Sequence, residues 1–187
     1  MLKFTKFNAL LLAAVIGFSV SCKEEEDEME KPTPTLYDRV GGTTMVSDPA
    51  NSGDMIQQGR LTLRSVVDSA IFVIAADSDL QPYFTTLLGE VGNGDLSGFA
   101  ALSTNLTDFF VVATSEGKVG TYTGLNMKDA HDPAVNSRMD GKADNDAMDA
   151  FIADVGISLG QNGVTDQELI NDLVALLETV RGDVVQQ

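Results

Sequence analysis

Apolar residues recur at the three- and four-residue spacing of a helix along most of the chain beyond residue 60. They fall at positions 63, 66, 67, 70, 71 and 74, and again at 99, 102, 106, 109, 110 and 113. Two further stripes run from Met148 to Leu159 and from Leu169 to Val180. Because this spacing gathers apolar side chains on one helical face, each segment predicts an amphipathic helix. No segment alternates convincingly with the period of a strand, so the pattern predicts an all-α domain with about five main helices.

Glycine, proline and acidic residues mark the predicted connections. A short apolar turn from Leu36 to Val40 is ended by a Gly-Gly pair. We predict loops over residues 43–60, 88–98 and 132–146, because these stretches are polar, glycine-rich or rich in acids. Asp95 or Ser97 is the expected cap of the helix that carries Phe99, and Thr165-Asp-Gln-Glu168 has the pattern of a capping box.

The first 22 residues have the features of a secretory signal. Two lysines precede an apolar run from Ala9 to Val20, which is too short to span a bilayer comfortably, and small residues precede Cys22. Cys22 is the only cysteine, so no intramolecular disulfide is possible. Its surroundings resemble a bacterial lipoprotein box, with Ser19 where leucine is usual. This resemblance implies acylation of Cys22, removal of residues 1–21 and a lipid anchor in the outer membrane of the cell envelope. A plain signal peptide with an incidental cysteine is the alternative.

Residues 22–35 form an acidic segment that contains two prolines. Because like charges repel and prolines favour an extended chain, we expect a disordered tether. The acidic run directly after the cysteine also resembles the surface-export signal of Bacteroidetes lipoproteins, and a solvated spacer in the periplasm is the alternative. The remaining stretch, residues 36–187, has the length of one domain with a substantial core.

The charge balance restricts the possible partners. The chain carries 28 acidic and 12 basic side chains, a formal net charge of −16 at pH 7, and removal of the signal with its two lysines would make it −18. Such a field repels nucleic acid and anionic membrane surfaces. No basic stripe or set of stacking aromatic residues counters it, so we exclude nucleic acid as a partner. The sequence indicates no particular protein partner.

His131 is the only histidine. Any function that needs a neutral imidazole ligand or a group titrating near neutral pH must use this residue. One histidine cannot build a multi-histidine metal centre. It is sufficient as the protein ligand of a haem iron, because the porphyrin supplies the other four nitrogens. A lone histidine is more often a surface or satisfied residue. No Gly-x-Ser-x-Gly motif is present, which disfavours a hydrolase that uses His131 as its base.

Short motifs occur in a characteristic order around this histidine and along the rest of the chain. They are Leu36–Gly42, Val66–Asp68, Ala75–Leu80 followed by Tyr83-Phe84, Tyr122–Gly124, Met127–His131, Asp149–Phe151 and Leu169–Val184. In this order they resemble group I of the truncated haemoglobin family over roughly residues 36–185. The resemblance implies a truncated globin-like helical sandwich, in which residues 43–60 and 132–146 are inserted loops.

The same resemblance implies a cofactor and the residues that contact it. The cofactor is haem, iron protoporphyrin, with the imidazole of His131 as the metal ligand. Phe84 corresponds to the family's aromatic residue that packs on the ring. The expected cofactor-binding residues are His131, Phe84, Ile71, Leu102, Leu106 and Met127. Lys128 and Arg138 flank the ligand helix, where they either hold the propionates or serve only solubility.

The gas-binding side departs from the family pattern. Group I members often carry a tyrosine on the second helix and a polar residue on the crossing helix, but Ile71, Leu102 and Leu106 occupy these positions here. None of the three can donate a hydrogen bond. The missing bond is worth on the order of 1–3 kcal/mol, so we expect weak oxygen binding with fast release and a smaller effect on carbon monoxide or nitric oxide. A shift of one residue in the alignment would bring Asn105 into the pocket.

Two functions therefore compete. The first is a lipid-anchored haem protein that reversibly binds oxygen, nitric oxide or carbon monoxide through His131, and the sequence does not decide whether it is also an enzyme. The second is a haem-free globin-fold lipoprotein whose acidic surface serves a protein contact or a structural role, since a fold alone does not determine function.

Overall fold

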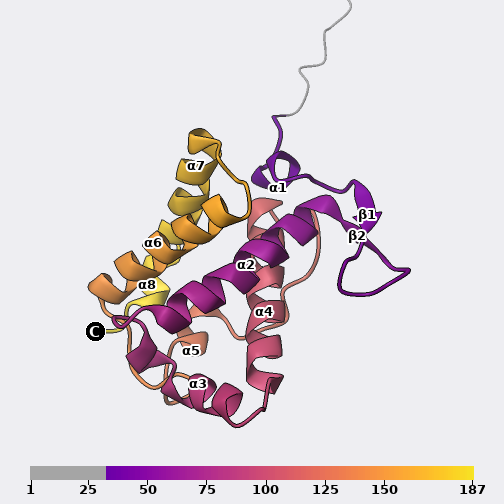
Figure 1. Ribbon diagram of the computed structural model, residues 1–187. Coiled ribbons are helices and arrows are strands. Elements are labelled where there is room, and N and C mark those ends of the chain that lie inside the picture. The colour runs from indigo at the N-terminus through magenta and orange to yellow at the C-terminus, as the bar shows by residue number, and fades with distance from the viewer. Residues whose placement is uncertain (1–32) are drawn as a thin grey trace, which may run out of the picture. The chain divides into compact units, whose positions relative to one another are not determined.

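The computed structural model describes residues 33–187 (Figure 1). The predicted signal peptide, the lipidation site Cys22 and most of the predicted tether lie outside the described residues. Four long helices frame the described part: α2 (Gln58–Ala76), α4 (Ser97–Thr114), α6 (Asn145–Gln161) and α7 (Gln167–Glu178). The shorter elements are α1 (Leu36–Arg39), β1 (Met45–Ser47), β2 (Met55–Gln57), the 3₁₀ turn η1 (Gln81–Tyr83), α3 (Thr85–Gly92), α5 (Met127–Ala130) and α8 (Arg181–Val184).

The long helices form two layers. One layer pairs α2 with α4, and the other pairs α6 with α7. The layers meet where α2 packs on α6 and α4 packs on α7, and Figure 1 shows α2 running diagonally between α6 and α4. This arrangement confirms the predicted all-α, globin-like sandwich. No helix within residues 33–187 is long and apolar enough to cross a membrane.

The predicted apolar stripes form the core between these layers. Val67 of α2, Met148 of α6 and Leu173 of α7 are each at most 2% exposed, and Phe110 of α4 is 5% exposed. Burying side chains of this size contributes about 1.5–3 kcal/mol each, which explains why the helices keep their apolar faces together. The helical spacing read from the sequence therefore identified the buried faces of α2, α6 and α7. On α4 the buried face carries Thr107, Phe110, Val111 and Thr114, and of these only Phe110 belongs to the predicted stripe.

The segment 43–60 was wrongly predicted as a loop. Residues Met45–Ser47 and Met55–Gln57 pair as an antiparallel hairpin, and α2 begins at Gln58 rather than at Leu61. The strands are three residues long, which is too short for a clear alternation of apolar and polar positions. One inward pair, Val46 opposite Ile56, is enough to fix the hairpin against the domain, because Ile56 is buried.

The segment 88–98 was also wrongly predicted as a loop, because α3 extends through its first residues to Gly92. The helix is short, contains two glycines and buries one side chain, Leu87, so its amphipathic pattern was too weak to detect. The start of α4 also differs from the prediction. Leu96 precedes α4 without a side-chain cap, although the Asp95 carboxylate accepts a hydrogen bond from the Ser97 amide at 2.9 Å.

The start and end of the last helix also differ from the prediction. Asp166, rather than Thr165, caps α7, and its carboxylate accepts hydrogen bonds from the backbone amides of Glu168 and Leu169. The helix ends at Glu178, and α8 follows after a short break. The predicted 132–146 loop does lack regular structure up to residue 144, where Asp144 caps α6.

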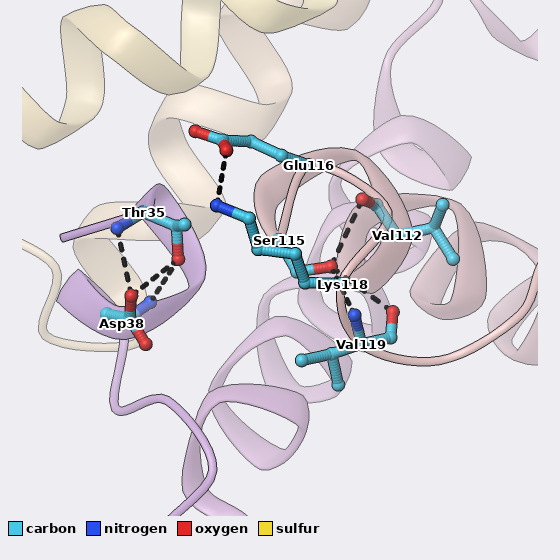
Figure 2. A network of polar contacts seen from close by, with 7 residues as sticks. All are labelled: Thr35, Asp38, Val112, Ser115, Glu116, Lys118 and Val119. Carbon is cyan, nitrogen blue, oxygen red and sulfur yellow. Dashed lines mark hydrogen bonds and ion pairs between the residues drawn. The ribbon is translucent and has the colours of Figure 1, made fainter. Parts of the chain in front are cut away.

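A polar network stabilises the start of the described domain and the end of α4 (Figure 2). Thr35 and Asp38 cap each other across α1, so ordered structure includes Thr35, the last residue of the predicted tether. At the end of α4, the Ser115 hydroxyl accepts a hydrogen bond from the Val119 amide at 3.0 Å, and Lys118 pairs with Glu116. Two of the contacts satisfy backbone groups at helix ends: the Thr35 hydroxyl accepts from the Asp38 amide, and the Ser115 hydroxyl donates to the Val112 carbonyl.

Candidate functional site

An apolar cavity of about 300 Å³ lies among α2, α3, α4, α5 and the C-terminal half of the fold. Its walls bring together every residue that the sequence predicted to contact a cofactor. These residues are Ile71, Phe84, Leu102, Leu106, Met127 and His131. A concave, mostly apolar cavity with a few polar groups is the usual form of a cofactor site.

His131 lies at the C-terminal end of α5, with its ring largely shielded from solvent. Nδ1 lies 2.8 Å from the carbonyl oxygen of Met127. A carbonyl oxygen can only accept, so Nδ1 carries the proton in this contact. Nε2 is then the unprotonated nitrogen of the neutral ring, and it makes no hydrogen bond to any residue in 33–187. Such a backbone contact fixes both the tautomer and the orientation of a metal-binding imidazole.

Electrostatics favour the same neutral state. Burial lowers the pKa of His131 below its ordinary value of 6.5, and the hydrogen bond to Met127 opposes this effect only in part. A neutral imidazole is the form that binds a metal ion, so no proton has to be displaced near neutral pH.

The four-residue helix α5 is too short to be stable alone, and other segments hold it in place. Its four carbonyls all accept hydrogen bonds. His131 Nδ1 donates to the Met127 carbonyl, and Gln186 Nε2 donates to the Lys128 carbonyl at 2.7 Å. The Asp132 amide donates to the Asp129 carbonyl at 3.4 Å, and Asn136 Nδ2 donates to the Ala130 carbonyl at 2.8 Å. At the other end, the Asn126 side chain caps the helix by accepting from the Asp129 amide at 3.0 Å.

The contacts of Tyr122 shape the Tyr122-Thr-Gly124 turn that precedes α5. The Tyr122 hydroxyl donates to the Leu125 carbonyl, and its ring lies edge-on to Phe109 with centroids 6.1 Å apart. A Cβ atom at Gly124 would lie 2.6 Å from the Tyr122 hydroxyl oxygen, so a larger residue would have to displace this ring. The turn therefore places α5 and His131 against the cavity.

The polar groups of the wall are few. Ile71, Leu102 and Leu106, which the alignment placed on the gas-binding side, line the cavity from α2 and α4. Asn105 also lines it, so the cavity admits the residue that a shifted alignment would have placed there. Among the α4 residues that line the cavity in the described part of the chain, Asn105 is the one whose side chain can donate a hydrogen bond.

The 132–144 segment contributes wall residues that the sequence analysis missed. Asn136, Arg138, Met139 and Ala143 line the cavity, and Met139 is 8% exposed. Asp140 ties the segment to α3, because its carboxylate accepts from the Thr86 amide at 2.8 Å and from the Thr86 hydroxyl at 2.6 Å. An acidic, proline-containing stretch carries no periodic signal, so only the flanking position of Arg138 drew attention to it.

The two predicted insertions differ in their relation to the cavity. The 132–144 segment forms part of its wall, whereas no residue of the hairpin Met45–Gln57 lines it. Lys128 does not line it either, while Arg138 does. Within residues 33–187, no group of three or more histidine, cysteine, aspartate or glutamate side chains is placed to hold a metal ion.

Comparison with known structures supports the fold. A truncated haemoglobin from Tetrahymena pyriformis, solved in its Fe(III) form as a tyrosine-to-phenylalanine mutant, matches with a TM-score of 0.56 and 20% sequence identity. The match covers 82% of this chain and 100% of that chain. No protein-family model and no curated protein sequence matches the chain. The chain therefore has the truncated-haemoglobin fold.

Proposed function

We propose that the domain binds haem in the cavity through Nε2 of His131 and that it reversibly binds a diatomic gas. One observation carries the proposal. The ring of His131 is neutral and half-buried, and its Nδ1–H is used by the Met127 carbonyl, so Nε2 is left for a metal beside an apolar cavity. The similarity to a truncated haemoglobin structure supports the same function.

The residues of the cavity fit this cofactor. Its apolar walls suit a flat ring with an apolar body, and Phe84 offers an aromatic face for packing. When bound, haem would supply an iron atom that can bind a small gas molecule. The protein orients the ring through His131 and excludes water with the apolar side chains of α2 and α4.

The wall composition also sets the expected gas preference. Ile71, Leu102 and Leu106 provide no hydrogen-bond donor, and the Asn105 residue is largely exposed to solvent. We therefore propose weak oxygen binding with fast release. Carbon monoxide and nitric oxide depend less on a hydrogen-bond donor, so we propose that they bind comparatively well.

The test is an absorption spectrum of the purified protein after addition of haem. We expect one haem per chain and a Soret band that shifts or disappears in His131→Ala, with recovery when free imidazole is added to the variant. The recovery separates loss of the ligand from loss of the fold. An unchanged spectrum in the variant, or no stoichiometric uptake by the natural chain, contradicts the proposal and leaves a haem-free globin-fold module.

We further propose that Cys22 carries a lipid that anchors the protein in the outer membrane. The support is the sequence pattern of the first 35 residues. Labelling cells with a radioactive fatty acid should mark the natural protein and leave Cys22→Ser unlabelled. Protease added to intact cells then decides between a surface-facing and a periplasmic position.

A further inference from the structure

Arg138 is distinguished from the other cationic side chains of residues 33–187 because it alone lines the cavity. It lies on the 132–144 segment, and its Nε is 3.0 and 2.9 Å from the two carboxylate oxygens of Glu90 on α3. The guanidinium group is planar, so this contact fixes the orientation of the whole group. Within the described part of the chain, its terminal nitrogens Nη1 and Nη2 make no hydrogen bond. Glu90 therefore orients Arg138 and leaves two donor groups free.

The pair is built closely against α4. A Cβ atom at position 98 would lie 2.1 Å from Glu90 Oε2 and 2.7 Å from Arg138 Nε, so a side chain at this point of the helix would displace the ends of both side chains. The side chain of Arg138 remains 42% exposed, and a ligand in the cavity can therefore reach it.

Arg138 is also linked to the histidine. The Asn136 side chain accepts from the Arg138 amide at 3.1 Å and donates to the carbonyl of Ala130 at 2.8 Å. Ala130 immediately precedes His131. One asparagine thus sets the position of the cationic residue relative to the imidazole, as expected for two contact points of a single ligand.

We propose that Arg138 is the anion-binding residue of the cavity and that its terminal nitrogens bind a carboxylate at the edge of a flat, apolar ligand. The inference rests on the proposed function, under which this carboxylate is a haem propionate. Two acids lie near the group, Glu90 and Asp95, and the Asp95 carboxylate is already bound to the Ser97 amide. A guanidinium has five donors, so it can serve Glu90 and a ligand carboxylate together.

The experiment compares iron-free protoporphyrin IX with its dimethyl ester, which lacks the negative charges but keeps the ring. Binding to the purified protein is followed by porphyrin fluorescence. We expect Arg138→Gln to weaken binding of the diacid by about ten- to hundredfold, because a charged hydrogen-bonded contact is lost, and to leave binding of the diester unchanged. Lys128→Gln, which removes a cation that does not line the cavity, should leave both affinities unchanged.

The outcomes separate this inference from the proposed function. An equal loss for diacid and diester in Arg138→Gln would show a purely structural role and overturn the inference, while the haem spectrum and its dependence on His131 still stand. If the glutamine variant does not fold, Arg138→Lys gives the test: it should keep the preference for the diacid, and loss of discrimination in this folded variant would overturn the inference. Failure of the natural chain to bind either porphyrin would overturn both proposals.

Discussion

A charge on the ring of His131 is costly where that residue lies. Burial holds its pKa below the value in an unfolded chain, so the unfolded state takes up a proton first as the pH falls. His131 therefore has no effect on stability well above its unfolded pKa. As the pH falls from about 6.5 towards the pKa of His131 in the folded protein, protonation of the unfolded chain lowers the free energy of unfolding. Below the folded pKa this loss of stability stays constant.

This prediction is tested with His131→Gln, because the amide replaces the only imidazole in the chain. Urea unfolding of the haem-free protein should show that the natural chain loses stability relative to the variant between pH 8 and pH 5, values chosen as about 1.5 pH units on either side of 6.5. Carboxylates common to both chains cancel in this difference. A difference independent of pH would mean that the ring is hydrated in the folded state.

At the scale of an element, the packing of α3 against α4 depends on a glycine. We expect Gly98→Ala to be less stable than Gly89→Ala by about 1 kcal/mol, because the added methyl group would displace the side-chain ends of the Glu90–Arg138 pair. Chemical denaturation of the haem-free protein measures this change.

The matched control lies on α3 itself. A Cβ atom at Gly89 would meet nothing within 4 Å. Gly89→Ala should therefore be neutral or stabilising by up to about 1 kcal/mol, because alanine favours a helix. If both variants were equally stable, the close approach at Gly98 would not be a real constraint.

The short helix α5 depends on the C-terminal segment. Gln186→Ala removes the donor to the Lys128 carbonyl, so we expect faster amide hydrogen exchange over residues 127–131 with little change in global stability. Gln167→Ala is the control, because that side chain bonds only within α7, to Asn171. Unchanged exchange in α5 would show that the contact does not hold the helix.

Comparison of the elements shows what local sequence can reveal. The four long helices were predicted because their apolar stripes span several turns. The stripes of α2, α6 and α7 face the core, whereas Leu102, Leu106 and Phe109 of the α4 stripe line the cavity. The hairpin and α3 were missed because each presents one or two inward side chains, and tertiary contacts stabilise them more than local pattern does. The residue-level prediction of the cavity depended on motif order for His131 and Phe84. Arg138 was named from the sequence only together with Lys128, and the structure distinguishes the two because Arg138 lines the cavity and Lys128 does not. Asn136 was missed, because its significance lies in its contact with α5.

At the scale of the whole molecule, acidic side chains far outnumber basic ones, with a formal net charge of −16. The arginines of residues 33–187 are engaged in ion pairs, including Arg39 with Asp172, Arg60 with Asp108 and Arg64 with Asp48. Most acids therefore remain without a cationic partner, and their mutual repulsion opposes the compact state.

Salt should stabilise such a molecule. We expect the thermal unfolding midpoint to rise as sodium chloride is increased from about 10 mM to about 200 mM, because the screening length shortens to less than the width of the domain. Choline chloride should act similarly, which excludes specific sodium binding. A falling midpoint would show that the ion pairs outweigh the general repulsion.

The contacts of the last residues have a practical consequence. The Gln186 amide donates to the Ala143 carbonyl at 2.9 Å, and its side chain holds the helix that precedes His131. A purification tag fused after Gln187 would therefore disturb the position of His131, on which the haem absorption spectrum depends. A tag on the N-terminal side joins the described domain beside α1, none of whose residues line the cavity. Spectra intended to characterise the iron ligand should come from protein tagged at that end.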